Sequence, residues 1–154
     1  MARRFQFRLR SLLLLLVAGG VLLGLGKWCY DAYQPVRLPW KPYTRREMSK
    51  LESGQRPVLI HFTAYWNLNS SYMLRSSLGD REVAAELKRR GFELRLADWT
   101  DPNPEIDQAL AEYQSLSIPL TVILPAGKFD EPIILRDLVS KRQLLAAIEK
   151  AGGE

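Results

Sequence analysis

The sequence predicts an α/β protein, a three-layer sandwich with a mixed central sheet, preceded by an apolar N-terminal helix. Three stretches with strand patterns are each separated from the next by a stretch with helical periodicity, and a short turn joins the third to a fourth. Strands separated by helices call for parallel pairing with right-handed crossovers, and the short turn calls for an antiparallel hairpin at one side. A length of 154 residues allows one such domain with an appendage.

Residues 1–30 are expected to form a membrane anchor or a signal segment. An apolar stretch covers residues 11–26 and ends before Lys27, Trp28 and Tyr30, and four arginines precede it: Arg3, Arg4, Arg8 and Arg10. We favour a single-pass transmembrane helix, because the aromatic pair suits the membrane interface and the cleavage site near Gly26 is poor. The alternative is a signal peptide, whose removal leaves a secreted or periplasmic protein. Either way, the positive-inside rule predicts an extracytoplasmic domain, and a retained anchor has its N-terminus in the cytoplasm.

Charge and cysteine content exclude several functions. The net charge of +5 lies entirely within the first 27 residues, and beyond Lys27 the acidic and basic residues balance, so no nucleic-acid partner is expected. Cys29 is the only cysteine, which excludes an internal disulfide, a Cys-rich zinc site and a dithiol pair within one chain. The single histidine, His61, with scattered carboxylates does not make a metal site. We expect no cofactor.

The domain is predicted over residues 44–154. Residues 31–43 contain three closely spaced prolines and are expected to form a Pro-rich tether. Thr44 and Glu47 match a capping box, so a helix is expected to start there and to stop at Gly54. The apolar run at 57–64 predicts a strand that is buried on both faces. The later elements are expected as helices at 67–77 and 81–90, a strand at 92–98, a helix at 104–116, strands at 118–124 and 133–137, and a closing helix at 140–151.

Three segments carry a family resemblance. "RPVLIHFTAYWNLNS", "LADWTDPNPEI" and "SIPLTVIL" follow one another at residues 56–70, 96–106 and 117–124. In this order they resemble the thioredoxin-like superfamily, and most closely the C-terminal thioredoxin-like domain of the thiol:disulfide interchange protein DsbD. The resemblance covers about Thr44 to Ala151. In the family a Cys-x-x-Cys motif follows the tryptophan, and here Asn-Leu-Asn-Ser stands in its place.

The resemblance implies a site that lacks the catalytic residues of the family. Aligned on Trp66, Asn67 falls on the first family cysteine and Ser70 on the second, so no catalytic residue is expected. An amide cannot attack a disulfide, but Asn67 is a good N-cap for the following helix. Ser70 needs a nearby base to act as a nucleophile, and the only histidine lies in the middle of a strand. His61 falls where many relatives have a buried acid, and it is expected to be either a neutral core side chain or a pH-sensing group.

The resemblance also implies a partner-binding surface at Trp66, Asn67, Ile118 and Pro119. In the family, a cis-proline presents the backbone of the preceding residue to an extended segment of a partner protein. The alternative is a proline that only turns the chain into its strand. The polar loop from Asp98 to Asn103 follows a strand, where ligands of α/β sheets tend to bind, and a capped turn explains it equally well.

Three functions follow from these observations. The first is a redox-inactive protein-binding or scaffold module, tethered to the membrane and part of an envelope or thiol-redox-related assembly. The second is a thiol:disulfide interchange oxidoreductase that uses Cys29 or a partner thiol. The third is a structural subunit of a membrane assembly in which the surface around Trp66 is unused.

Overall fold

The computed structural model describes residues 2–152, with the side chains of residues 11–30 and 34–152. The chain divides into two units between Gln34 and Pro35. The first unit consists of helix α1 (Ala2–Tyr33), in which the 20 residues Ser11–Tyr30 are apolar enough to cross a membrane and have no buried part. At about 1.5 Å per residue, this stretch matches the ~30 Å hydrocarbon core of a bilayer. A membrane anchor or a signal sequence has these properties, and a core helix of a soluble domain does not.

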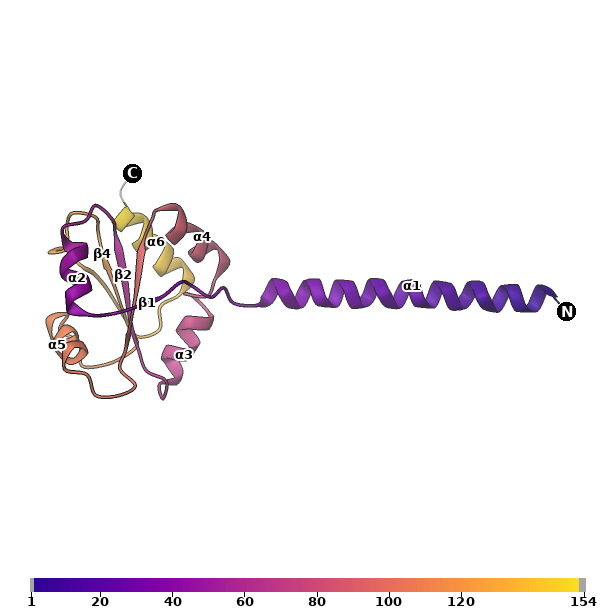
Figure 1. The fold of residues 1–154 in the computed structure, drawn as a ribbon, viewed down its shortest axis with the longest axis horizontal. Helices are drawn as coiled ribbons and strands as arrows, with labels where there is room; N and C mark the ends of the chain where they lie inside the picture. The colour runs from indigo at the N-terminus through magenta and orange to yellow at the C-terminus, as the bar shows by residue number, and fades with distance from the viewer. Residues whose placement is uncertain (1, 153–154) are drawn as a thin grey trace. The chain divides into compact units, whose positions relative to one another are not determined.

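The second unit is built on one five-stranded mixed sheet (Figure 1). The strands are β1 (Lys41–Pro42), β2 (Val58–Thr63), β3 (Glu93–Asp98), β4 (Leu120–Leu124) and β5 (Ile133–Arg136). Their spatial order is β1-β3-β2-β4-β5. β3 pairs in parallel with both β1 and β2, whereas β4 is antiparallel to its neighbours β2 and β5. Every residue of β2 is buried, as its apolar run predicts.

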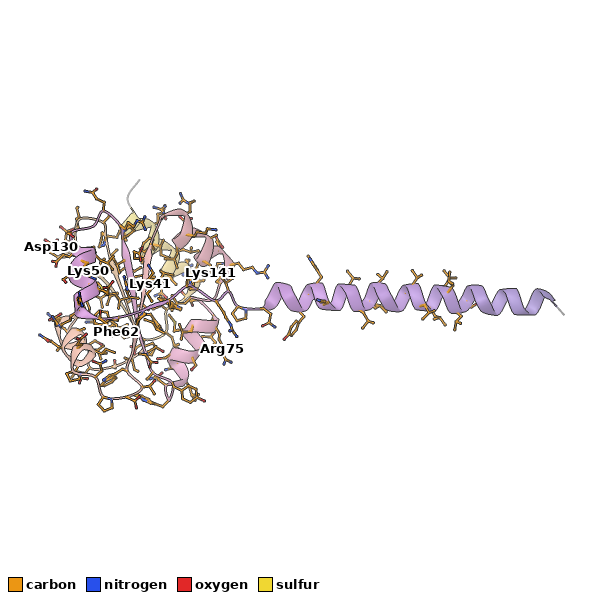
Figure 2. The ribbon with its side chains drawn as sticks, in the orientation of Figure 1. Lys41, Lys50, Phe62, Arg75, Asp130 and Lys141 are labelled. Carbon is orange, nitrogen blue, oxygen red and sulfur yellow. The ribbon has the colours of Figure 1, made fainter. Side chains whose placement is uncertain are left out.

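Helices cover both faces of this sheet (Figure 1). α2 (Arg45–Glu52) and α5 (Pro104–Glu112) lie on one face, and α3 (Leu68–Arg75), α4 (Arg81–Arg89) and α6 (Lys141–Gly152) lie on the other. Side chains of β2 alternate between two hydrophobic clusters, Phe62 belonging to the α2/α5 side and Leu59 to the α3/α4/α6 side. Figure 2 shows Phe62 inside the domain and Lys50 and Asp130 at its surface. The predicted three-layer sandwich is therefore confirmed.

Polar residues at the helix starts explain where the helices begin. The side chains of Thr44, Asn67, Asp80 and Asn103 each accept a hydrogen bond from a backbone N–H in the first turn of α2, α3, α4 and α5. Such a cap stabilises a helix by about 1 kcal/mol. Gly91, with a φ of 68°, follows the end of α4 in a conformation that favours glycine. These boundaries agree with the ones expected from the sequence.

The direction of β4 differs from the sequence prediction. Strands separated by a helix are expected to be parallel, but β4 runs antiparallel to β2. α5 ends at Glu112, before the expected boundary at residue 116, and residues 113–119 return the chain to the end of the sheet where β3 stops. Leu120 starts β4 opposite Phe62, one residue before the end of β2, so β4 has to run back along the sheet.

Residues 35–43 also differ from the expected tether, because they pack against the domain. The Val36 amide donates a hydrogen bond to the Gly79 carbonyl at 2.8 Å, and residues 41–42 form edge strand β1. Along this segment partly buried and exposed residues alternate, and Leu38 and Trp40 contact the cluster beneath α3, α4 and α6. Pro42 is tolerated in β1 because this strand lies at the edge of the sheet. Proline has no backbone N–H, and at an edge this does not remove a hydrogen bond between two inner strands.

Candidate functional site

The candidate site lies where β2 and β3 end and β4 begins. Thr63, the last residue of β2, is opposite Asp98, the last residue of β3. Leu120, the first residue of β4, is opposite Phe62. The turn after β2 therefore lies beside the loop that enters β4, and α3 starts at this same edge of the sheet.

Asn67 links the start of α3 to the loop before β4. Its Oδ1 accepts a hydrogen bond from the Ser70 backbone N–H at 2.9 Å, which caps the helix. Its Nδ2 donates to the Ile118 carbonyl oxygen at 3.0 Å. The Ile118–Pro119 peptide bond is cis. The structure thus brings Asn67, Ile118 and Pro119 together, although they are about 50 residues apart in the chain.

Trp66 lies at the surface of the same region and is held by the loop after β3. Its Nε1 donates to the Thr100 carbonyl at 3.2 Å, and its ring lies 6.3 Å from the ring of Trp99, centroid to centroid. The Tyr65 amide donates to Thr100 Oγ1 at 2.9 Å. Trp66 is nevertheless 57% exposed, so one side of the indole is held in place and the other faces solvent.

The loop from Asp98 to Asn103 has a structural role in this arrangement. Asp98 Oδ1 accepts a hydrogen bond from the Thr100 amide at 3.0 Å, and Asn103 Oδ1 accepts one from the Glu105 amide at the start of α5. Thr100 in turn holds Tyr65 and Trp66. This bonding matches the capped-turn reading of the loop, in which its polar side chains position Trp66.

Three further apolar side chains border the site, and the sequence reasoning did not identify them. Tyr65 is 89% exposed, Leu68 84% and Leu116 97%, which makes them the most exposed large hydrophobic residues described in the domain. Tyr65 and Leu68 flank Trp66 and Asn67 in the chain, and Leu116 precedes Ile118 by two residues. Tyr65 and Leu68 could have been found because each directly adjoins a predicted site residue at a helix start, whereas Leu116 was hidden by the expectation that the helix extends to residue 116.

His61 and Ser70 do not form a catalytic pair. His61 is fully buried, its Nδ1 lies 3.0 Å from Thr121 Oγ1, and its ring centroid lies 6.2 Å from that of Trp40. Burial lowers the pKa of His61 from 6.5 to about 3, so the ring is neutral throughout the physiological pH range. Ser70 is also buried, and its Oγ has no hydrogen-bond partner among the described residues, as is true of His61 Nε2. Without a base at hydrogen-bond distance, the Ser70 hydroxyl is not activated.

The described residues contain no group of three or more His, Cys, Asp or Glu side chains able to hold a metal ion. Cys29 lies in α1 and is exposed, and within residues 35–152 there is no sulfur other than that of methionine. The arrangement around Asn67 can therefore offer apolar surface, backbone groups and hydrogen bonds, and no thiol.

Comparison with known proteins agrees with this geometry. The C-terminal domain of DsbD from Neisseria meningitidis matches in its reduced form with a TM-score of 0.57 and 18% identity, covering 72% of this chain and 99% of that one. Its oxidised form matches with a TM-score of 0.58 and 19% identity, over 73% and 98% of the two chains. A thioredoxin from Thermus thermophilus has a TM-score of 0.53 and 17% identity, over 72% and 85%. At these identities the likeness concerns the fold.

Sequence comparison identifies the family independently. No curated protein matches the chain. A family model described as "Thioredoxin-like" matches residues 39–126, more than half of the sequence. The match starts within the segment that packs ahead of α2 and includes the whole candidate site. This chain belongs to the thioredoxin-like family.

Proposed function

We propose that this protein is a membrane-tethered, extracytoplasmic thioredoxin-like domain that has no redox dithiol and binds an extended segment of a partner protein. In this role it is a binding or scaffold module of an envelope or thiol-redox-related assembly. The binding surface comprises Trp66, Asn67, Ile118 and Pro119.

The observation that carries the proposal is the position of Asn67. It caps α3, where a thiolate would be stabilised by the helix dipole and the free amides, and it offers a carboxamide there. Thiol exchange requires a sulfur nucleophile, and an amide cannot form the mixed disulfide. The hydrogen bond from Asn67 Nδ2 to the Ile118 carbonyl keeps the two sides of the surface together without that chemistry.

The surroundings of Asn67 support protein binding. The side chains of Tyr65, Trp66, Leu68 and Leu116 expose apolar area beside it, and aromatic residues are the usual anchors of protein interfaces. Ile118 is only 8% exposed, but its backbone N–H donates no hydrogen bond to any described residue. A backbone amide of this kind can pair with the carbonyl of an extended segment, which is how strand addition gains affinity.

Membrane tethering is supported by the composition of α1. Ser11–Tyr30 has the length and hydropathy of a membrane span, and arginines precede it. The anchor is tested by alkaline carbonate extraction of membranes from cells that express the full chain. If α1 is an anchor, the chain should stay with the lipid. Protease added from outside the cytoplasm should degrade the domain. Release by carbonate would favour the cleaved signal peptide.

The competing function is thiol:disulfide interchange through Cys29 or a partner thiol. Cys29 is exposed, but it lies near the C-terminal end of α1 and not at a helix N-terminus, where a thiolate is stabilised. The test is reduction of insulin disulfides by the full chain and by Cys29→Ser, both in detergent. We expect both to match the rate without protein. Turnover that disappears in Cys29→Ser would establish the interchange function, and turnover that persists in it would refute the inert domain.

Partner binding is tested by photo-crosslinking at the exposed positions. A benzophenone amino acid at Leu68 or Leu116 in the full chain should give protein adducts in membranes, whereas one at Arg142 on α6 should not. Trp66→Ala should reduce adduct yield about 30-fold, as expected when an interface anchor worth ~2 kcal/mol is removed. Tyr72→Ala is the matched control, because Tyr72 is exposed to a similar degree on the next turn of α3. Yields unchanged in Trp66→Ala would favour a structural subunit with an unused surface.

A further inference from the structure

A cavity of about 620 Å³ lies between α4 and the segment that precedes β1. Its volume falls in the range of small-molecule sites, ~300–1,000 Å³. The buried side chains Leu87 and Leu94 line it, together with the partly buried Leu38 and Phe92, and all four belong to or contact the cluster beneath α3, α4 and α6. We call this cavity the α4 groove. Its floor is therefore formed by apolar side chains that belong to the core or pack against it.

The sequence of α4 explains why the groove is open. Arg81, Ala84, Ala85 and Lys88 all line it, and their spacing places them on one face of the helix. The two alanines in the middle of this face leave room, and the long basic side chains stand at its two ends. This pattern differs from an ordinary solvated helix face, which carries both signs of charge.

The charge around the α4 groove has one sign. Four basic residues line it, and no acidic residue does; the four are Arg37, Arg56, Arg81 and Lys88. The acidic residues of α4 are engaged elsewhere, since Glu82 pairs with Lys141 at 2.8 Å and Glu86 pairs with Arg89 and Arg90. Arg56 pairs with Glu93 at 3.1 Å, which partly neutralises it. Arg37 and Lys88 are exposed and belong to no ion pair among the described residues.

Chain connectivity limits how far the α4 groove can be from the candidate membrane span. The span ends at Tyr30, and Val36 already lines the groove. Six residues reach at most about 20 Å even when fully extended, and the first three of them are helical and therefore reach less. If α1 is anchored in a bilayer, the groove is held within reach of the lipid headgroups of that bilayer.

We propose that the α4 groove binds an anionic phospholipid of the membrane in which α1 is anchored. The phosphate contacts the basic side chains, above all Arg37 and Lys88, and an apolar part of the lipid lies against Leu38, Phe92 and the alanines of α4. This inference rests on the proposed membrane anchor and is independent of the partner surface around Trp66. An apolar floor with a basic rim is complementary to such a lipid, and the same rim repels a cationic ligand.

The test uses the full chain in nanodiscs of phosphatidylcholine, with or without phosphatidylglycerol. A benzophenone amino acid replaces Ala85 in the groove, or Ala146, which is likewise an exposed helical alanine but lies on α6. Mass spectrometry then counts lipid adducts. We expect phosphatidylglycerol adducts from position 85 at about tenfold the yield from position 146, and above the phosphatidylcholine yield from position 85.

Variants show whether the rim charges cause this preference. A basic residue close to an anionic surface contributes about fivefold in affinity, so Arg37→Gln with Lys88→Gln should lower phosphatidylglycerol adducts about 30-fold. Arg46→Gln with Arg142→Gln makes the same change in net charge at two exposed residues outside the groove and should lower them little. Thermal unfolding is the control that each variant is folded. We expect both double variants to be folded, because all four side chains are exposed.

Three outcomes would overturn the inference: equal adduct yields at positions 85 and 146, equal yields with the two lipids, or an equal loss in the two double variants. Adducts to a protein in place of lipid, in native membranes, would assign the groove to a protein partner and also overturn it. Carbonate extraction separates these failures from failure of the anchor, because an anchored chain without lipid adducts refutes only the α4 groove proposal.

Discussion

Acidification from pH 7 to pH 5 should destabilise the domain through His61 alone. The neutral imidazole is buried in the folded state with a pKa of about 3, and the unfolded chain takes up a proton near pH 6.5. Because the folded-state pKa is the lower one, the unfolded state binds more protons, and stability falls as pH drops below about 6.5 until it reaches about 3. His61 is the only histidine in the sequence, so no other imidazole contributes.

The size of this effect follows from the two pKa values. Linkage gives a loss of about 2 kcal/mol in unfolding free energy between pH 7 and pH 5, and a total near 5 kcal/mol once the pH is well below the folded-state value. Carboxylates with a lowered pKa, such as Glu86 and Glu93, retain their stabilising contribution above their unfolded-state values and lose it mainly below pH 5. The window from pH 7 to pH 5 therefore isolates the histidine.

The assay is urea unfolding of residues 35–154 followed by far-ultraviolet circular dichroism at half-unit pH steps. This unit contains the whole sheet and both hydrophobic clusters. His61→Gln, which cannot take up a proton and can still hydrogen-bond to Thr121, should remove the pH dependence whatever its absolute stability. A change below about 0.5 kcal/mol in the native protein would show that the imidazole can be protonated without unfolding. The same change in His61→Gln would show that other groups cause the pH dependence. Either result would refute the reasoning.

Three predictions concern the start of α3. Asn67→Ala should lower the unfolding free energy by about 2 kcal/mol, and Asn67→Ser, which keeps the capping oxygen and loses only the donor to Ile118, by about 1 kcal/mol; equal losses in urea titrations would contradict the dual role of Asn67. Ser70→Ala should leave stability unchanged or raise it by up to about 1 kcal/mol, because the buried hydroxyl has no partner among the described residues; a loss above 1 kcal/mol would reveal a hidden partner such as a buried water. Asn67→Cys with Ser70→Cys should recover measurable insulin reduction, whereas a folded but inactive double variant would mean that the geometry no longer supports thiol exchange.

Local sequence signals were sufficient for the helix starts and the layers of the fold. Thr44, Asn67, Asp80 and Asn103 each combine a short polar side chain with a following helical pattern, and a cap is a contact within three residues of the chain. The burial of β2 could also be predicted from the sequence, because a strand that is covered on both faces has a continuous run of apolar residues. Such features depend on residues that are close together in the sequence, so the local sequence is enough to predict them.

Some of the features that the sequence did not predict depend on distant residues. The direction of β4 is set by where residues 113–119 return, which no local pattern encodes. The packing of residues 35–43 does have a local signal, the alternation of partly buried Val36, Leu38 and Trp40 with exposed residues, but the prolines between them obscured it. The family resemblance led us to expect Asn67 and Ile118 in one surface, although they are 51 residues apart, but the hydrogen bond between them was seen only in the structure.

The hydrogen bonds of Asn67 also explain how a thioredoxin-like fold can keep this part of its architecture without sulfur. A helix start at a sheet edge leaves backbone N–H groups that need an acceptor, and the loop before β4 presents a carbonyl that needs a donor. A single carboxamide satisfies both, with Oδ1 facing the Ser70 amide and Nδ2 facing the Ile118 carbonyl. A thiol is a weak donor and a weak acceptor, so an asparagine holds this junction more firmly than a cysteine would. The position is therefore suited to a fixed surface for binding, and the carboxamide that fixes it offers no sulfur for disulfide exchange.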